Sequence, residues 1–379
     1  MLPLEGVRVV EFSHMVMGPT CGLILADLGA EVIKVEPPGG DRTRQLRASG
    51  TGFFPALSRN KKSVTVAMDD TAEHERLLRL VDTADVVIEN FRPGALEAKG
   101  LGWDALSARN PRLIYLSLKG FLSGPYEHRT ALDEVVQMMA GLAYMTGPPG
   151  RPLRAGAPVN DMMGGMFGAI AVLAALRRRE STGVGERLQS GLFENAAFLV
   201  STAMLQGAVT GTAPPPMPGG RRAWGVYDVF TAADGVQIFV GVVTERQWEI
   251  FTAALAAPAL ADPRFATNND RSAHREVLIP LVQEILGTRP VAEIEAMCET
   301  AGLPYARINT PGDLYDDPHL RAGGGLLPIT LPDGRATKVP ALPIEMDGQR
   351  LGVRLDLPRP GQHNQEVFGE EADADLRAG

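Results

Sequence analysis

Cysteine, patterned histidine and an apolar N-terminal segment are all scarce in this sequence. Its 379 residues contain two cysteines, Cys21 and Cys298, far apart and outside any CxxC spacing. A disulfide framework and a zinc site are therefore not expected. The six histidines show no HxxxH or HExxH spacing, so we expect no metal centre. The start of the chain, MLPLEGVRVVEF, lacks the apolar core and cleavage site of a secretory signal.

Long apolar runs and a strong excess of basic charge are also missing. The longest apolar run, residues 162–176, covers 15 residues and includes three glycines. It is shorter than the roughly 20 residues that a membrane span needs. A net charge of −8 argues weakly against nucleic-acid binding. We therefore expect a cytoplasmic protein that binds neither membranes nor nucleic acid, with enough apolar sequence, 45%, for a large core.

Strand-like and helix-like patterns alternate in the first third of the chain. The pattern predicts strands at 7–12, 31–36, 63–66, 85–90 and 112–118, and helices at 21–28 and 70–83. Such alternation implies parallel βαβ units and a sheet covered by helices on both faces. The first strand–helix junction lacks GxGxxG, so a dinucleotide site of the usual kind is not predicted.

A stretch rich in proline and glycine, TGTAPPPMPGG at residues 210–220, divides the chain. It is followed by a hairpin pattern at 226–242 and then by helical patterns, which together predict a smaller α+β domain over residues 220–321. The large domain is expected to span residues 1–215. The tail, residues 325–379, is too small to fold alone, so we expect it to return and pack on the large domain.

Asp161 is the one carboxylate in NDMMGGMFGAIAVLAAL, residues 160–176. It could cap the helix that this apolar run forms, or lie in the first turn of a helix capped by Asn160. It could also be exposed there for chemistry, because a helix N-terminus favours a carboxylate charge by a few tenths to about 1 kcal/mol. Gly164 and Gly165 would then keep the space before it free of side chains. The local sequence leaves these alternatives open.

Several segments, in the same order over nearly the whole chain, resemble the class III coenzyme A transferases of the formyl-CoA and carnitine-CoA transferase type. They include VRVVEFSHMVMGPTCGLILADLGAEVIKVEPPGGDRTR, ADVVIENFRPGALEAKGLG, NPRLIYLSLKGF, the Asp161 segment and GLPYARINTPGDL. The resemblance implies an α/β fold with an open Rossmann-like large domain built from both chain ends, a smaller α+β domain, and an interlocked homodimer. It also implies an enzyme that moves CoA from an acyl-CoA donor to a small carboxylic acid acceptor without a metal.

Residue by residue, the resemblance makes Asp161 the nucleophile, which would form a mixed anhydride and then an aspartyl-CoA thioester. The positions that match the family's CoA contacts are His14, Met15, Val16, Met17, Val66, Asn90, Phe91 and Arg92. Met15 and Met17 are equally typical of core packing, and Arg92 of a solvated turn. A guanidinium pairs well with CoA phosphates, which favours a phosphate role for Arg92.

The chain departs from the family at two arginines. Pro37 and Pro38 stand after the second strand, and Ala98 stands beside Lys99. Lys99 is therefore a candidate for phosphate binding. Other basic residues that could take that part are Arg42, Arg44, Lys61 and Lys62. A pair such as Lys61–Lys62 is also typical of a solvated loop. Gly219–Gly220 matches a glycine-rich lid in some relatives, or is a plain linker.

Two alternatives to a transferase remain open at this point. The α-methylacyl-CoA racemases share the fold and exchange a proton with a histidine–aspartate pair. At the matching position this chain keeps Asp133, whose plainest role is to cap the helix that begins at Glu134, but it has Leu132 where the histidine would stand. The loss of one acid–base partner usually costs about 10²–10⁴-fold in rate. A CoA-binding protein without activity is the other alternative, although it would have no need of Asp161.

Overall fold

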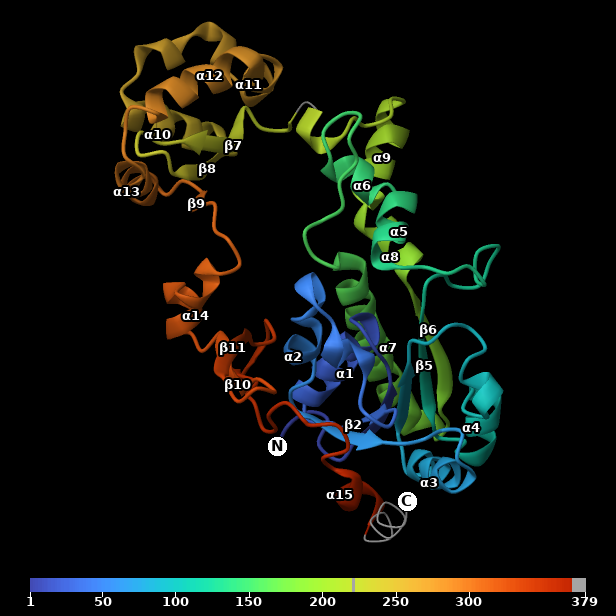
Figure 1. Ribbon diagram of the computed structural model, residues 1–379. Helices are drawn as coiled ribbons and strands as arrows, with labels where there is room; N and C mark the ends of the chain where they lie inside the picture. Colours follow the sequence, from blue (N-terminus) through green and yellow to red (C-terminus); the bar gives the residue numbers. More distant parts are fainter. Residues whose placement is uncertain (220–221, 370–379) are drawn as a thin grey trace. The chain divides into compact units, whose positions relative to one another are not determined.

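The computed structural model describes residues 1–219 and 222–369. Within them the chain divides into two compact units. The first unit contains residues 1–214 and 318–369, and the second contains residues 215–219 and 222–317. The boundaries expected from the sequence differ from these by a few residues. The first unit is therefore built from both ends of the chain, drawn in blue to green and in red (Figure 1).

The first unit is built around a sheet in which the described residues form six parallel strands. The strands are β1 (Arg8–Phe12), β2 (Glu31–Glu36), β3 (Lys61–Thr65), β4 (Val86–Glu89), β5 (Ile114–Lys119) and β6 (Glu186–Gly191). Their order is β3-β2-β1-β4-β5-β6, so the order reverses between β1 and β4. In open parallel sheets, ligands bind outside the carboxyl ends of the strands at such a reversal.

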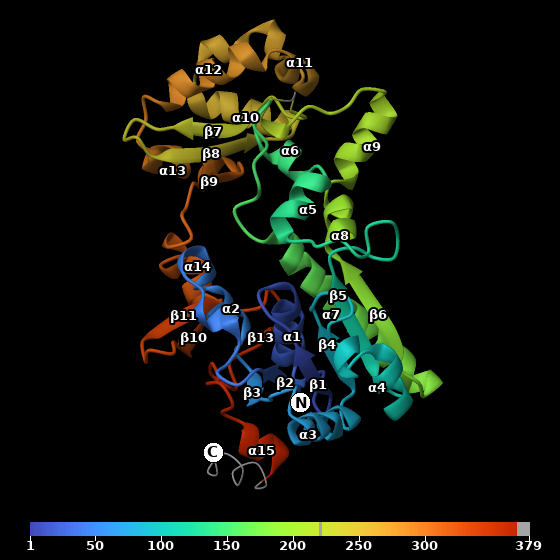
Figure 2. The same ribbon diagram turned by 45° about the vertical axis from the view of Figure 1, so that its right-hand side comes forward.

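Helices cover both faces of this sheet, as the alternating pattern predicts (Figures 1 and 2). The helices of this part of the chain are α1 (Met17–Asp27), α2 (Phe53–Leu57), α3 (Thr71–Asp82), α4 (Trp103–Arg109), α5 (Asp133–Met139), α6 (Leu142–Thr146), α7 (Val159–Thr182), α8 (Leu192–Leu199) and α9 (Ser201–Thr210). Side chains of α1 and α7 form one core with one face of the sheet. Side chains of α3 and α4 form a second core with the other face.

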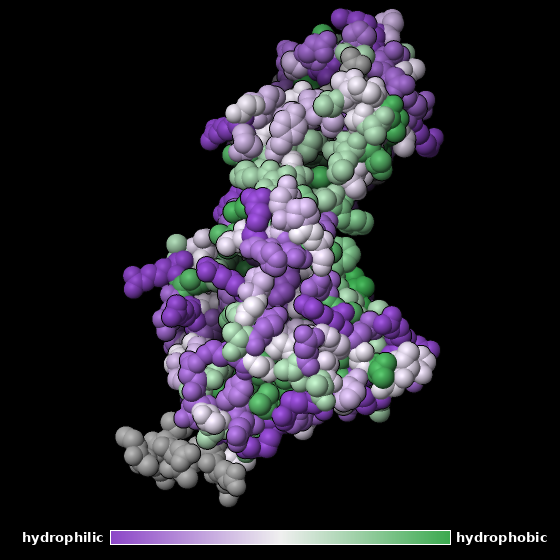
Figure 3. Space-filling model, turned by 90° about the vertical axis from the view of Figure 1, so that its right-hand side faces the viewer, coloured by the Kyte–Doolittle hydropathy of each residue, from purple (hydrophilic) through white to green (hydrophobic). Residues whose placement is uncertain are grey.

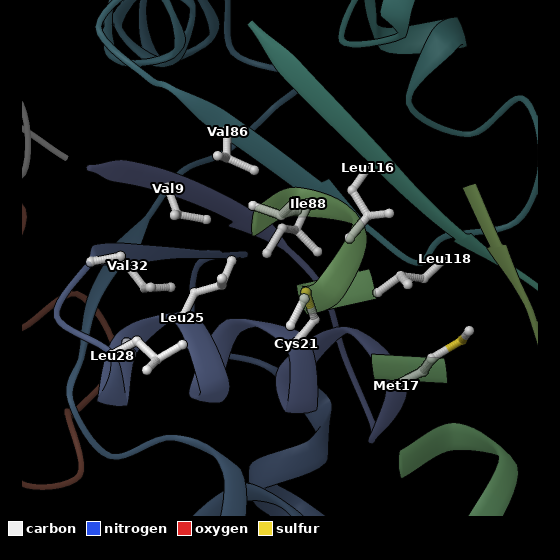
Figure 4. Packing of buried hydrophobic residues seen from close by; sticks show 14 of the residues in the cluster. Val9, Met17, Cys21, Leu25, Leu28, Val32, Val86, Ile88, Leu116 and Leu118 are labelled. Carbon is white, nitrogen blue, oxygen red and sulfur yellow. The ribbon is translucent and has the colours of Figure 1, made fainter. Parts of the chain in front are cut away.

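The first of these cores explains why apolar residues recur along β1, β2, β4 and β5. Val9, Val32, Ile88 and Leu116 project from the strands toward α1, where Cys21 and its helical neighbours meet them (Figure 4). The intervening strand residues, such as Val10 and Val87, belong to the opposite core. Strands that are buried on both faces have no polar alternation, which is the pattern of a parallel sheet.

Helix α7 carries glycines on the side that packs against α1 and the sheet. Added Cβ atoms at Gly164, Gly165 and Gly168 would come within 3.0 Å of atoms of Met17, Thr20, Asn195, Leu116 or Leu118, so glycine permits the close approach of α7 to α1 and the sheet. Among the described residues, α7 is long and apolar enough to cross a membrane, and the bent pair α8–α9 also meets that criterion. A core helix has the same length and composition.

The second unit contains an antiparallel three-stranded sheet with four α-helices in its described residues. Its elements are β7 (Val226–Thr231), β8 (Gln237–Val242), α10 (Glu245–Leu255), α11 (Asn268–Ala273), α12 (Arg275–Leu286), α13 (Val291–Ala301) and β9 (Tyr305–Arg307). The strand order is β7-β8-β9. Its own core is centred on aromatic and aliphatic residues such as Phe230, Trp248, Phe251 and Leu278. The hairpin and helices agree with the α+β pattern read from the sequence.

After the second unit the chain returns to the first. The elements of this return segment are α14 (Pro318–Ala322), β10 (Leu326–Thr330), β11 (Ala336–Pro340), β12 (Glu345–Met346), β13 (Gln349–Arg350) and α15 (Asn364–Phe368). The segment is fixed along strand β3, where His363 donates its backbone N–H to the Ser63 carbonyl at 3.0 Å. Asn60 adds hydrogen bonds to the backbone of Gly352, Arg354 and Leu355.

Candidate active site

A cavity of about 760 Å³ opens at the carboxyl ends of β1, β4 and β5 in the first unit. The segments that line it are residues 14–17 after β1, Ser49 and Phe53, residues 90–93 after β4, residues 118–120, residues 127–134, and Arg154, residues 156–158, Asp161 and Leu192. The cavity therefore lies at the point where the strand order reverses. That is where an open parallel sheet binds its ligand.

The loop after β1 is held to the loop after β4 by one asparagine. His14 donates its backbone N–H to Asn90 Oδ1 at 3.0 Å, and Asn90 Nδ2 donates to the His14 carbonyl at 2.9 Å. The His14 ring lies 5.3 Å from the Phe91 ring, centroid to centroid. Burial lowers the pKa of His14, which favours the neutral form of its ring. His14, Asn90 and Phe91, expected separately from the sequence, thus form one wall of the cavity.

Asp161 lies in the first turn of α7 but does not cap it. The N-cap position of α7 is Pro158, which has no side-chain cap. Instead, Asp133 Oδ1 accepts the backbone N–H groups of Asn160 and Asp161 at 2.8 and 3.1 Å. The amides at the start of α7 are thus capped by a residue of another helix, and the Asp161 carboxylate does not bind the backbone of α7. Among the described residues it has no hydrogen-bond partner, and it faces the cavity.

The role that the sequence suggested for Asp133 is therefore wrong. Helix α5 begins at Asp133 itself, and its carboxylate serves α7 instead of the helix that follows it. Asp133 is buried, and its second oxygen accepts a hydrogen bond from Gln137 Nε2. Gln137 Oε1 in turn accepts the Ala155 N–H at 2.8 Å. Asp133 and Gln137 thus fix both the approach to α7 and its first turn.

The environment of Asp161 favours the neutral form of its carboxyl group. Burial raises the pKa of Asp161 to about 7, and the negative charges of Asp133 and then Glu134 add to the rise. A carboxyl group with this pKa is roughly half ionised at neutral pH. The helix N-terminus considered in the sequence analysis favours the charged form, by at most about 1 kcal/mol. Burial outweighs that effect because the carboxylate has no protein donor to solvate it.

The glycines after Asp161 have another function than the one we expected. Gly164 and Gly165 are both buried against α1 and do not line the cavity. A Cβ at Gly164 would lie 2.3 Å from Met17 Cε, and one at Gly165 would lie 2.6 Å from the Met17 carbonyl oxygen. They bring the starts of α1 and α7 together, which places Met17 beside the turn that carries Asp161. They do not clear an entrance.

Most of the basic residues considered for phosphate binding are used by the fold. Arg44 pairs with Glu36 at 2.6 Å and stacks on Phe54, and Lys62 pairs with Glu31 and Glu366. Lys61 lies in β3, not in a solvated loop, and it is fully buried beside Glu11 of β1. Lys99 pairs with Asp69, and neither it nor Arg42 lines the cavity.

Val66 is buried in the core on the α3 side of the sheet and does not reach the cavity.

Arg92, in contrast to Val66, does line the cavity. Its side chain is exposed at the cavity wall, with no ion-pair partner among the described residues. Arg129, which the sequence did not single out, also lines the cavity, stacked 4.9 Å above the Tyr126 ring. The lid candidate Gly220 and the neighbouring Arg221 lie outside the described residues.

The position of the racemase histidine is occupied by an exposed leucine. Leu132 is 59% exposed and lines the cavity, so an aliphatic side chain stands where proton exchange would need a base. His128 also lines the cavity, where its ring meets Glu127 at 3.1 Å. Within the described part of the chain, the cavity thus combines a carboxylate that has no hydrogen-bond donor, two guanidinium groups that have no ion-pair partner, and apolar side chains. This combination suits an elongated anionic ligand with a reactive carbonyl group.

Comparison with known proteins agrees with this reading. The family model described as CoA-transferase family III matches residues 4–364. The chain is 34% identical over 374 residues to succinyl-CoA–D-citramalate CoA-transferase of Chloroflexus aurantiacus, covering 97% of this chain and 93% of that protein. It is 32% identical over 386 residues to succinate–glutarate CoA-transferase of Agrobacterium fabrum, covering 97% and 95%. No support for racemization comes from these relatives.

The fold is also that of a solved member of the family. The crystal structure of a CAIB/BAIF family protein from Brucella suis superposes with a TM-score of 0.85 at 32% identity, covering 99% of both chains. The family match and the structural match thus both extend over nearly the whole chain. The chain belongs to CoA-transferase family III.

Proposed function

We propose that this protein transfers CoA from an acyl-CoA donor to a small carboxylic acid, with Asp161 as the nucleophile. The observation that carries the proposal is the Asp161 carboxylate itself. It faces a cavity large enough for an elongated ligand, has no hydrogen-bond partner among the described residues, and stands in a turn whose amides are satisfied by Asp133. A carboxylate kept free in this way is available for attack on a thioester carbonyl.

The transfer proceeds in two symmetrical halves. The Asp161 carboxylate attacks the donor thioester, which forms a mixed anhydride and releases the CoA thiolate. The thiolate attacks the aspartyl carbonyl of the anhydride, which gives an aspartyl-CoA thioester and frees the donor acid. The acceptor carboxylate then attacks this thioester, and the released thiolate takes the acceptor's acyl group from the second anhydride. Asp161 is regenerated, and no net proton or electron is exchanged.

Small carboxylic acids are the acceptor class that we propose. D-citramalate and glutarate appear in the names of the two relatives above, which supports this class. The exposed guanidinium groups of Arg92 and Arg129 at the cavity wall fit a substrate pair that is anionic throughout. Arg154 contributes less free charge, because it pairs with Glu134 at 2.8 Å.

The proposal is tested by incubating the protein with succinyl-CoA and a panel of small mono- and dicarboxylic acids, and by following new acyl-CoA masses. Hydroxylamine added during turnover should convert Asp161 to a hydroxamate that is found by peptide mass spectrometry. The same incubation with free CoA in place of succinyl-CoA is the control. If neither a new acyl-CoA nor a labelled Asp161 forms with any acid, the proposal is wrong.

Replacement of Arg92 with alanine should weaken CoA binding about threefold to tenfold at low salt, because an exposed phosphate contact is worth roughly 1 kcal/mol. The difference from the unmodified protein should shrink above about 0.1 M salt, where charges farther apart than about 10 Å are screened. Isothermal titration with CoA at several salt concentrations measures it. Arg79→Ala, which removes the same charge from exposed α3, is the matched control. If the two variants bind CoA with equal affinity at low salt, Arg92 has only a structural role.

We also propose that the protein forms the interlocked homodimer that its sequence resemblance implies. Apolar side chains of α7, α8 and α9 support this assembly, because Ile170, Phe198, Leu205 and Val209 are between 59% and 85% exposed. Figure 3 shows hydrophobic side chains exposed among hydrophilic ones on one face of the molecule. Large apolar side chains exposed in this number on three successive helices are typical of an interface. Sedimentation at the mass of one 40.5 kDa chain at micromolar concentration would contradict it.

A further inference from the structure

Charged side chains are buried in the middle of the sheet, directly beneath the loop after β1. Glu11, Lys34 and Lys61 each have at most 1% of their side chain exposed. Lys61 Nζ lies 2.8 Å from Glu11, and Lys34 Nζ lies 3.7 Å from it. Burying ions is unfavourable unless each is paired and hydrogen-bonded, and an apolar core is often as stable. Stability alone therefore does not explain why these charges stand here.

A chain of contacts connects these charges to the cavity. Lys34 Nζ donates to the Ser13 carbonyl at 2.6 Å and lies 3.0 Å from the Asp41 carboxylate. Asp41 Oδ1 accepts the Thr43 backbone N–H at 2.8 Å. The Thr43 hydroxyl, finally, accepts the backbone N–H of Met15 at 3.0 Å. Every member of this chain except Met15 is buried.

The chain ends at a residue whose backbone is strained. Met15 has φ of 63°, a left-handed conformation that costs a non-glycine residue about 1–2 kcal/mol. Such a conformation persists only where the surroundings fix it, and it occurs most often at functional sites. Here Thr43 holds Met15 from one side, and Asn90 holds the neighbouring His14 from the other. The strained residue itself lines the cavity.

We propose that Thr43 is a positioning residue for CoA. Held by Asp41 and Lys34, it fixes the left-handed turn at Met15 and so presents the loop of residues 13–17 to the ligand. The proposal rests on the proposed function, because it takes CoA as the ligand of this cavity. Thr43 does not line the cavity, so its effect on binding passes through the loop. Without the hydroxyl, the Met15 N–H loses its acceptor and the turn relaxes.

Thr43→Val tests this role, because valine keeps the shape of the side chain and removes the acceptor. We expect the Kd for CoA to rise about tenfold, which is the cost of one unsatisfied backbone N–H. The rate of thioester cleavage at saturating acyl-CoA should stay within about threefold of the unmodified value, because the surroundings of Asp161 are unchanged. Thr43→Ser keeps the hydroxyl, so this variant should bind CoA about as tightly as the unmodified protein. Titration calorimetry with CoA and single-turnover kinetics with succinyl-CoA measure the two quantities.

A purely structural role is distinguished by a matched variant in the same region. Ser63 is also buried, and its hydroxyl donates to Glu36 at 2.6 Å, but among the described residues it has no hydrogen bond to the loop of residues 13–17. Ser63→Ala should lower the melting temperature without changing the Kd for CoA. If Thr43→Val binds CoA as tightly as the unmodified protein, or if Thr43→Ser fails to recover affinity, the positioning role is wrong. If the unmodified protein binds no CoA, the proposed function fails as well, which separates the two results.

Discussion

Replacement of Asp161 with asparagine should abolish CoA transfer while leaving CoA affinity within about twofold, because the amide has nearly the shape of the carboxylate but cannot form the anhydride. The loss should be at least about a thousandfold, as for other residues that form a covalent intermediate. Steady-state turnover of succinyl-CoA with the best acceptor acid measures it, together with calorimetric titration of CoA. Asp161→Ala guards against slow deamidation of the asparagine back to aspartate.

The same substitution should make the protein more stable at alkaline pH. Since burial raises the pKa of Asp161 to about 7, above its ordinary 3.8, the folded protein binds this proton more tightly than the unfolded chain does. The stability that this proton contributes is complete below pH 3.8 and is lost as the pH rises through about 7. Near pH 8 the ionised group thus destabilises the fold by at most about 4 kcal/mol, the equivalent of three pKa units.

Asp161→Asn removes this cost, so its free energy of unfolding should exceed that of the unmodified protein at pH 8 by more than at pH 5. Urea denaturation at the two pH values measures the difference. A variant that is inactive because it is misfolded would instead lose stability at both values. Substantial turnover in a well-folded Asp161→Asn protein, with the asparagine confirmed by mass spectrometry, would refute the role of Asp161 as nucleophile.

Much of the fold of the first unit follows from local patterns. β1, β2, β4 and β5 are short β-branched runs that are buried on both faces, and helices separate them along the chain. Strand β6 was not predicted, because it lies at the edge of the sheet and its sequence, ERLQSG, alternates partly buried and exposed residues. Only its pairing with β5 makes it a strand. The order of the strands likewise depends on contacts that no short segment specifies.

The candidate site was predictable only where it follows directly from strand ends. The segments after β1 and β4 were singled out by resemblance, and the strand order explains why both reach one cavity. The sequence could not show that Lys61 is buried, because its partner Glu11 is 50 residues away and lies on a non-adjacent strand. The contact between Asp133 and the first turn of α7 is equally remote in sequence, and so the cap was assigned to the wrong helix.

Neutralising Asp133 should move the pH dependence of CoA transfer to lower pH. Transfer requires the ionised form of Asp161, so the rate should rise with pH around the pKa of that group, which is about 7. After burial, the charge of Asp133 is the largest cause of this raised pKa. Asp133→Asn removes the charge and retains Oδ1, which accepts the amides of Asn160 and Asp161. The midpoint of the pH–rate profile should therefore fall below that of the unmodified protein.

The maximum rate of the profile should also fall. The amide nitrogen of Asp133→Asn would meet Gln137 Nε2, a second donor, in place of the carboxylate oxygen that now accepts from it. We expect this mismatch to cost about 1–3 kcal/mol of stability and to loosen the turn that carries Asp161. A less basic carboxylate is also a weaker nucleophile. The rate on the alkaline plateau should thus decrease, although the group is ionised at lower pH.

Glu134→Gln is the matched control for the effect of charge alone. Glu134 also raises the pKa of Asp161, but it is exposed, pairs with Arg154, and accepts no hydrogen bond from α7. Its neutralisation should shift the midpoint in the same direction by less than Asp133→Asn does and should leave the alkaline rate nearly unchanged. Single-turnover rates between pH 5 and 9 for the three proteins measure both quantities. A midpoint for Asp133→Asn that stays in place or moves to higher pH would show that its charge does not act on the nucleophile, and Asp133 would then serve α7 only as a cap.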